Sequence, residues 1–310
     1  MAQGMKELRR RIRSVTSIQK ITRAMEMVAT TRLRRMQGKA EGARPYADAI
    51  KAFSSLLAGG AVKLSSPLTT ARAKVGRIAL LVISSDRGLC GAYNANVFRK
   101  VSAFLGERKD LPLDLYTLGK KARTHYARRL AIKHAYPDEV EKLGFRRARE
   151  IAREMTELFL KGSEAGGVDE VFVVFTRFVS VGKQVTTVDR LLPITGDAPK
   201  AAEAKGTDPR SPDAKSHAAS AATAAAQILL EPSPQELFDQ LMPKSLAMRT
   251  FAAMLDSMAS EQAARRMAMK AATDAAGEMI GTLTRKYNRA RQETITKELL
   301  DIVGGAEALA

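Results

Sequence analysis

Residues 5–37, MKELRRRIRSVTSIQKITRAMEMVATTRLRRMQ, contain neither glycine nor proline and are rich in helix-forming side chains. At ~1.5 Å per residue they predict a helix about 50 Å long. Gly38, Gly42 and Pro45 interrupt the pattern, which then resumes to about Ala58. One face of this helix needs a covering element, because apolar residues recur along it at intervals of three and four. These residues are Leu8, Ile12, Val15, Ile18, Ile21, Met25 and Val28.

The C-terminal end of the chain repeats this pattern over a longer span. Between Lys244 and Val303 there is no proline, and Gly277 and Gly281 are the only glycines. A helix over that span would be on the order of 90 Å long. Two such helices bury their apolar faces most economically against each other, as an antiparallel coiled coil. The C-terminal helix would contribute Phe251, Leu255, Met258, Ile280, Leu283, Tyr287, Ala290, Ile295, Leu299 and Ile302.

The middle of the chain alternates between strand and helix patterns. Strands are expected at 78–85, 113–119, 132–137, 168–180 and 183–194, and helices at 91–105, 120–130 and 145–162. The last two strands are separated by a short turn, which predicts a hairpin. This alternation is typical of a mostly parallel sheet with helices on both sides, a Rossmann-like α/β domain.

Charge and composition limit the partners of the chain. It carries 51 Lys and Arg against 33 Asp and Glu, a balance that favours nucleic acid, an anionic membrane surface or an acidic protein. Ten of the basic residues lie in the first 36 positions, against only Glu7 and Glu26. Nucleic acid is the weaker candidate, because the chain has no tryptophan and few aromatic residues for base stacking. We expect no signal peptide and no membrane-spanning segment.

The stretch SSDRGLCGAYN, residues 84–94, follows a buried-strand pattern and raises the possibility of a phosphate loop. Gly88 and Gly91 are three residues apart and no Lys-Ser or Lys-Thr pair follows, so both the Walker and the dinucleotide patterns are incomplete. We therefore predict a turn from strand to helix that Asp86 braces. Cys90 is the only cysteine, which excludes an internal disulfide and a multi-cysteine metal site. A carboxylate pair of Asp86 with Asp114 is left open.

Cys90 is also considered as a nucleophile. The three histidines, His125, His134 and His217, are scattered along the chain, and none lies near Cys90 in sequence. A buried or loop thiol is therefore the preferred interpretation. The same scatter argues against a metal site.

Four motifs, in an order that spans nearly the whole chain, resemble the gamma-subunit family of the F-type ATP synthase. They are RIRSVTSIQKITRAMEMVATTRL near the start, SSDRGLCGAYN in the middle, EQAARRMAMKAATDAAGEMI at 261–280 and YNRARQETITKELLDIVGGA at the end. The resemblance implies a curved shaft of paired terminal helices inside a ring of three alpha and three beta subunits. It implies that the Rossmann-like domain meets the epsilon subunit and the membrane-embedded c-ring.

The resemblance also implies a function. Proton flow turns the c-ring and the shaft together, which couples rotation to ATP synthesis or hydrolysis at the ring and regulates ATPase activity and proton flow. The chain itself is then expected to have no catalytic residue, cofactor, metal, nucleic acid or small-molecule substrate. It is expected at the cytoplasmic side of the bacterial inner membrane, as a peripheral part of the complex.

Seven residues are assigned roles by matching these motifs. Met25 corresponds to a shaft position that faces an acidic loop of the beta subunits. Subunit contact or coupling is implied for four further residues, Arg265, Gln292, Thr296 and Glu298. The segment LLEPSPQELFDQLMP resembles the foot near the c-ring, so Leu230 and Glu231 are candidate contacts there.

The expected organisation has five segments. They are an N-terminal coiled-coil helix at 1–58, the Rossmann-like domain at 74–195, a low-complexity loop at 196–226, the foot segment at 227–242 and a C-terminal coiled-coil helix at 243–310.

Two other classes of protein fit parts of the sequence. One is a free-standing Rossmann-type enzyme with a helical dimerisation arm, and the other is a basic coiled-coil protein that binds nucleic acid.

Overall fold

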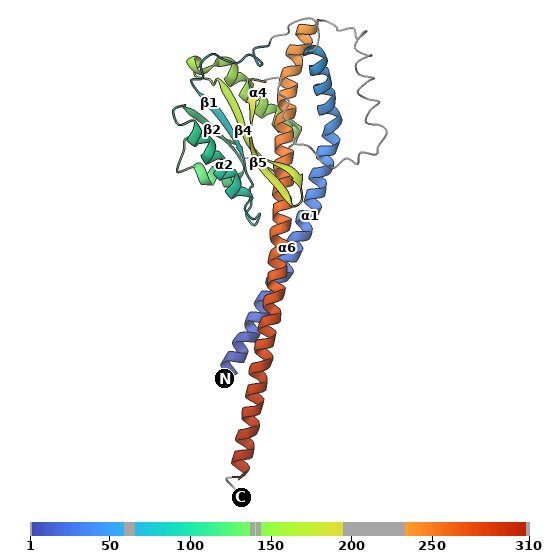
Figure 1. Cartoon of the computed structure of the whole chain (residues 1–310), viewed down its shortest axis with the longest axis vertical. Helices are drawn as coiled ribbons and strands as arrows, with labels where there is room; N and C mark the ends of the chain where they lie inside the picture. Colours follow the sequence, from blue (N-terminus) through green and yellow to red (C-terminus); the bar gives the residue numbers. More distant parts are fainter. Residues whose placement is uncertain (1, 59–65, 137–139, 141–143, 195–232, 308–310) are drawn as a thin grey trace. The chain divides into compact units, whose positions relative to one another are not determined.

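The computed structural model describes residues 2–58, 66–136, 140, 144–194 and 233–307 (Figure 1). The chain divides into two compact units. The helical unit comprises 1–34, 88–93 and 261–310, and the sheet unit comprises 35–87 and 94–260. Within the described ranges, no helix has both the length and the apolar character needed to cross a membrane.

The elements follow the order expected from the sequence. The long helix α1 (Ala2–Ala58) precedes the α/β elements in the sequence, and the long helix α6 (Pro234–Glu307) follows them. The strands are β1 (Ile78–Ile83), β2 (Leu113–Leu118), β3 (Ile132–Tyr136), β4 (Glu170–Ser180) and β5 (Lys183–Leu192). The helices between them are α2 (Tyr93–Glu107), α3 (Lys120–Tyr126), α4 (Phe145–Lys161) and the short 3₁₀ turn η2 (Ser163–Ala165).

The sheet unit has a five-stranded sheet in the order β3-β2-β1-β4-β5. All neighbours are parallel except β4 and β5, which form the expected antiparallel hairpin. Every residue of β1 is buried, as expected for a central strand covered on both faces. The mostly parallel sheet predicted from the sequence is confirmed.

Helices cover both faces of this sheet. On one face, the Phe104 ring of α2 packs against the Phe172 ring of β4 with ring centroids 4.9 Å apart. On the other face, Glu154 of α4 accepts a hydrogen bond of 2.9 Å from the Tyr136 hydroxyl of β3. Helix α6 adds a further contact, because the Ser260 hydroxyl donates to the Thr176 carbonyl of β4 at 3.0 Å.

The two long helices continue through residues that the sequence analysis treated as breaks. Pro45 lies inside α1, where it deprives the Glu41 carbonyl of its helical donor. Both residues are exposed, so water can hydrate that carbonyl. Helix α6 begins at Pro234 and contains Pro243, so it includes most of the predicted foot segment. Its start has a local cause, since the Ser233 hydroxyl accepts the Glu236 N–H at 3.2 Å as an N-cap.

In the helical unit, α1 and α6 run antiparallel to each other (Figure 1). The Thr273 hydroxyl donates to the Thr22 hydroxyl at 2.8 Å, and the Gln19 amide donates to the Thr273 carbonyl at 3.4 Å. The predicted pairing of the two ends is therefore confirmed. The predicted α1 seam is wrong in part, because four of its apolar members are exposed and Thr22 is buried in their place. The four are Ile18, Ile21, Met25 and Val28.

Candidate functional site

The four exposed residues form an apolar stripe on α1, which we call the α1 stripe: Ile18, Ile21, Met25 and Val28. Their intervals of three, four and three residues place them along one side of the helix. Met25 is 38% exposed and the other three are about half exposed. Exposed Lys20 and Arg23 lie within the same segment. A contiguous apolar surface with basic neighbours is typical of a protein interaction site.

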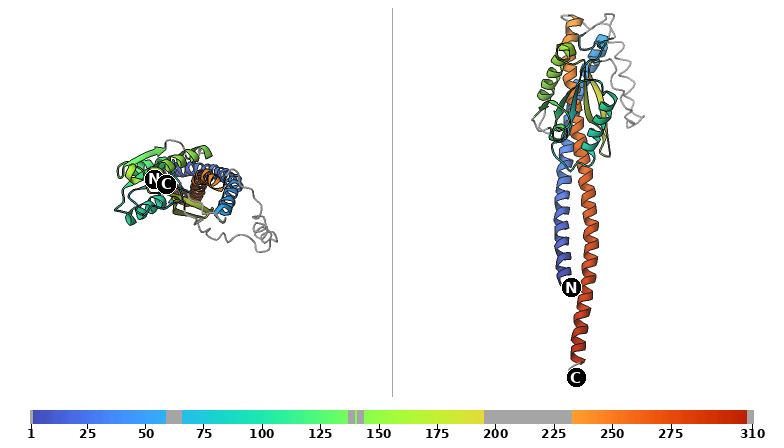
Figure 2. Two further views of the ribbon diagram at one scale, coloured as in Figure 1. Left: turned by 90° about the horizontal axis from the view of Figure 1, so that it is seen from above. Right: turned by 90° about the vertical axis from the view of Figure 1, so that its left-hand side faces the viewer.

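The C-terminal part of α6 is a second exposed surface in the helical unit. It continues alone past the N-terminus of α1 (Figure 2). Gln292, Thr296 and Glu298 are all exposed there. Large apolar side chains accompany them, because Ile295, Leu299, Leu300, Ile302 and Val303 are each roughly half to two-thirds exposed. This tip, residues 292–303, therefore offers both polar and apolar groups to a partner.

Arg265 occupies a different environment from the tip residues. Its guanidinium donates to Glu261 Oε1 at 2.7 Å and to the Gly88 carbonyl at 3.3 Å. The side chain is only 11% exposed and that of Glu261 only 3%. Arg265 is also about 40 Å from Gln292 along the helix at ~1.5 Å per residue. The structure thus separates Arg265 from the tip and makes it a residue that positions the loop containing Gly88.

Asp86, at the start of that loop between β1 and α2, is bonded to other segments of the sheet unit. The Asp86 carboxylate accepts the Lys120 N–H at 3.0 Å and the Val140 N–H at 2.7 Å. The bracing role predicted for Asp86 is therefore confirmed. Leu89 and Gly91 have positive φ angles of 62° and 55°, which is the conformation that glycine adopts without steric cost and leucine does not.

Two other sequence possibilities are resolved by the structure. Asp86 follows the carboxyl end of β1, whereas Asp114 is the second residue of the parallel strand β2. The two carboxylates therefore belong to opposite ends of the sheet, and the suggested pair does not form. Asp114 is instead 3.3 Å from the Arg77 guanidinium. Cys90 is buried, as the thiol interpretation predicted.

The two predicted c-ring contacts fall outside the part of the chain that the structure describes. Leu230 and Glu231 lie outside the described residues, so their contacts remain predictions. Over the described ranges, no group of three or more His, Cys, Asp or Glu side chains is placed to hold a metal ion.

Comparison with known proteins identifies the family. A family model described as ATP synthase matches residues 4–309. The ATP synthase gamma chain of Heliobacterium modesticaldum is 42% identical over 311 residues, which cover 99% of each chain. This chain belongs to the ATP synthase gamma-chain family. Another family member, the gamma chain of Mycolicibacterium smegmatis, is 40% identical over 323 residues and covers the whole of this chain.

Solved structures share the fold of this family member. One comes from the Euglena gracilis mitochondrial ATP synthase, an OSCP/F1/c-ring structure, with a TM-score of 0.64 and 17% identity over 100% of this chain and 95% of that one. Another is from the Tetrahymena thermophila central stalk and c-ring, with a TM-score of 0.56 and 21% identity over 81% and 99% of the two chains.

The sequence analysis missed the polar contact between the long helices of this gamma chain. Thr22 and Gln19 were not among the apolar residues from which the α1 seam was predicted. The sequence of the facing helix α6 could have indicated this contact, because it contains the small residues Thr273, Ala276 and Gly277 close together. Small side chains allow two helices to approach closely, so they mark the face that meets a partner helix.

Proposed function

We propose that this chain works as the rotating shaft of an F-type ATP synthase. As a gamma chain it is a central-stalk subunit of that complex. It couples proton-driven rotation of the c-ring to ATP synthesis, or ATP hydrolysis to proton pumping, at a ring of three alpha and three beta subunits. By the same coupling it regulates ATPase activity and proton flow, and the epsilon subunit is its further partner.

The observation that carries this proposal is the form of the helical unit. Two antiparallel helices present an exposed apolar stripe on α1 and a protruding tip on α6. A shaft of this kind acts as one asymmetric ligand that biases three equivalent sites into different states. It needs surface contacts that break at each step, and it needs no catalytic side chain. We accordingly assign ATP chemistry to the surrounding ring and none to residues of this chain.

The residue roles follow from this arrangement. Met25, in the middle of the α1 stripe, faces an acidic loop of the beta subunits, and the basic residues beside it favour that loop electrostatically. Gln292, Thr296 and Glu298 make polar contacts to the inner wall of the ring. Arg265 acts indirectly by holding the loop at Gly88. Leu230 and Glu231 are proposed to contact the c-ring.

The complex to which this chain belongs is associated with a membrane. We place the chain at the cytoplasmic side of the bacterial inner membrane, as a peripheral component. The bacterial origin of its relatives at 40–42% identity supports this location.

Replacement of the native gamma chain in a bacterial strain tests the proposal. The chain is expected to purify with alpha, beta and epsilon subunits, and inverted vesicles are expected to pump protons when ATP is added. A strain without any gamma chain is the control. The host's own gamma chain must assemble under the same conditions. If this chain is then expressed normally but does not join the complex, the shaft role is contradicted.

The two other classes of protein make distinct predictions for the isolated chain. A Rossmann-type enzyme would bind ATP or NAD saturably, and calorimetry is expected to show no such heat. A protein that binds nucleic acid would bind DNA at moderate salt more tightly than it binds an alpha-beta ring. In a competition experiment, a shaft subunit is expected to bind the ring in preference to DNA. Tight binding of a nucleotide or of DNA in preference to the ring would contradict the shaft role.

A further inference from the structure

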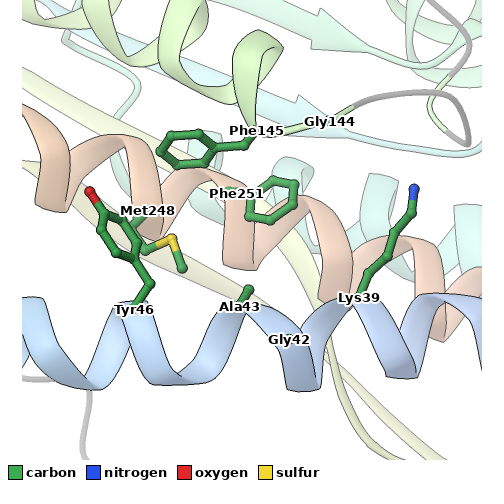
Figure 3. Close-up of a pocket in the computed structure, with 8 residues that line it drawn as sticks. All are labelled: Lys39, Gly42, Ala43, Tyr46, Gly144, Phe145, Met248 and Phe251. Atoms are coloured by element: carbon green, nitrogen blue, oxygen red, sulfur yellow. The ribbon is translucent and has the colours of Figure 1, made fainter.

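An apolar groove lies between α1, the start of α4 and the first part of α6, all within the sheet unit (Figure 3). Its walls carry Tyr46, Phe145, Met248 and Phe251 around a space of about 480 Å³. The Phe145 ring packs edge to face with both other rings, at centroid distances of 6.3 Å to Tyr46 and 5.6 Å to Phe251. Spaces of this size and lining are typical of binding sites.

A second hollow of about 750 Å³ extends the groove along α4. It shares Tyr46 and Phe145 with the first hollow and reaches Arg149 and Arg153 on α4 and Lys244 on α6. Tyr46 is 47% exposed, although an aromatic ring gains most from burial. The groove is therefore an elongated apolar surface left open to solvent.

The rim of the groove is positively charged on three sides. Lys39 comes from α1, Arg149 from α4 and Lys244 from α6, and none of the three makes an ion pair with any described residue. Glu150, the acidic residue of the lining, is already engaged by the Arg147 guanidinium at 2.6 Å. An occupant of the groove therefore meets unpaired cations beside an apolar floor, which favours carboxylates next to apolar side chains.

We propose that this groove binds an amphipathic helix from a partner protein, with apolar side chains on one face and carboxylates along its edges. The aromatic rings and Met248 would receive the apolar face. Arg149 and Arg153 are four residues apart on α4, which matches the spacing of carboxylates one turn apart on a second helix. Arg153 lies 3.5 Å from Glu157 on its own helix, and this exposed ion pair is weak enough for a carboxylate of the partner to replace it. The proposal stands on this surface alone and does not depend on rotation of the shaft.

A protein segment fits the charges better than an anionic lipid. The cations come from three different helices and stand at separate points along the groove. A lipid gathers its charge in one headgroup at the end of an apolar tail, whereas a helix distributes carboxylates along its length. The distribution of Lys39, Arg149 and Lys244 thus favours a helix.

A direct binding experiment uses the full chain and a synthetic probe. The probe is a fluorescent helical peptide of roughly 18 residues, long enough to form a helix, with leucines at intervals of three and four and glutamates beside them. Its control has lysines in place of the glutamates. Anisotropy is expected to show saturable binding of the glutamate peptide and at least about tenfold weaker binding of the lysine peptide. Failure to bind the glutamate peptide, or equal binding of both, would overturn the proposal.

A matched pair of glycine variants locates the binding. Gly42 lines the groove, and no atom lies within 4 Å of the place where its Cβ would stand. Gly42→Leu would therefore fill the groove while favouring the helix. Gly38, one turn earlier, is equally open but does not line the groove. Gly42→Leu is expected to weaken peptide binding by about tenfold or more, and Gly38→Leu is expected to leave it unchanged. Equal effects of the two variants would contradict a groove site.

A tryptophan reporter separates the peptide from a lipid. The chain has no tryptophan, so Tyr46→Trp places the sole indole in the groove. The glutamate peptide is expected to shift its emission to the blue, whereas phosphatidylglycerol vesicles, compared with phosphatidylcholine vesicles, are expected to have no effect. A shift with phosphatidylglycerol alone would reject the protein partner and assign the groove to a lipid.

Discussion

The carboxylate of Asp169 joins three separate parts of the sheet unit. Its Oδ2 atom accepts the Gly76 N–H at 2.7 Å and the Arg77 N–H at 3.2 Å, and its Oδ1 atom accepts the Ser163 N–H at 3.1 Å. The Arg72 guanidinium is 3.4 Å from Oδ1, and the Asp169 side chain is 1% exposed. One buried charge thus holds the segment before β1 against the loop that follows α4.

Asp169→Asn is expected to lower the free energy of unfolding by about 2 kcal/mol at neutral pH, because an amide nitrogen would face backbone donors. Burial alone raises the pKa of this carboxyl, but the hydrogen bonds from Ser163, Gly76 and Arg77 outweigh it and lower the pKa below its ordinary value. The carboxylate therefore stabilises the fold above the ordinary value of ~3.9, and this contribution is lost as the pH falls toward the lowered pKa.

Urea denaturation at several pH values measures both effects. The difference between wild type and Asp169→Asn should be largest near neutrality and shrink in acid. Glu164→Gln is the control, since Glu164 is an exposed acid in η2. A difference that stays constant with pH would mean that the Asp169 charge contributes nothing.

Met25→Lys tests the α1 stripe at its centre. The new ammonium group would attract the acidic loop that Met25 is proposed to face, and a stronger contact would resist the breakage that each rotation step requires. We expect ATP hydrolysis to continue with markedly less proton pumping per ATP in inverted vesicles. Met27→Lys is the matched control, because Met27 is 60% exposed on the same helix but points about 200° away from Met25. Equal pumping by wild type and Met25→Lys would exclude Met25 from the coupling surface.

At the scale of the elements, the contact between α1 and α6 depends on the fit of two surfaces. Apolar periodicity in α1 alone permits more than one seam, because residues at intervals of three and four occur on adjacent sides of the helix. The structure buries Thr22 and exposes Ile21 and Met25. Small residues of α6 decide this, since Thr273 bonds to Thr22 and Gly277 faces Gln19. No pattern within one helix contains that information.

Gly277→Leu is expected to weaken the contact between the two helices. A Cβ at Gly277 would lie 3.1 Å from the Gln19 amide nitrogen, so a leucine would displace that side chain and break its hydrogen bond to the Thr273 carbonyl. Overpacking of this kind costs about 1–3 kcal/mol. Gly281→Leu, one turn later, meets no atom within 4 Å and should be neutral or slightly stabilising. Thermal unfolding followed by circular dichroism compares them, and equal melting temperatures would show that the close approach at Gly277 is not needed.

At the scale of the whole chain, the sequence predicts the kinds of element better than their surfaces. The strands and the pairing of the ends follow from hydrophobic periodicity, which each segment carries within itself. The continuation of helices through Pro45 and Pro243 does not follow, because the packing that supports those turns comes from distant residues. The groove was equally hidden, since Tyr46, Phe145 and Phe251 come from three segments far apart in sequence. The exposed tip residues, in contrast, were found by motif resemblance.

Removal of the last dozen residues tests whether the tip serves assembly. The deletion takes away Leu299, Leu300, Ile302 and Val303, which are exposed in the helical unit, so the fold of the remaining chain should keep its melting temperature. Complex formation with alpha and beta subunits, or turnover of the assembled enzyme, is expected to fall, because the ring would lose an apolar contact at the end of the shaft. A double substitution, Leu299→Ser with Ile302→Ser, keeps the helix length and should reproduce part of the loss. Normal assembly and turnover of both variants would reduce the tip to an ordinary solvated helix end.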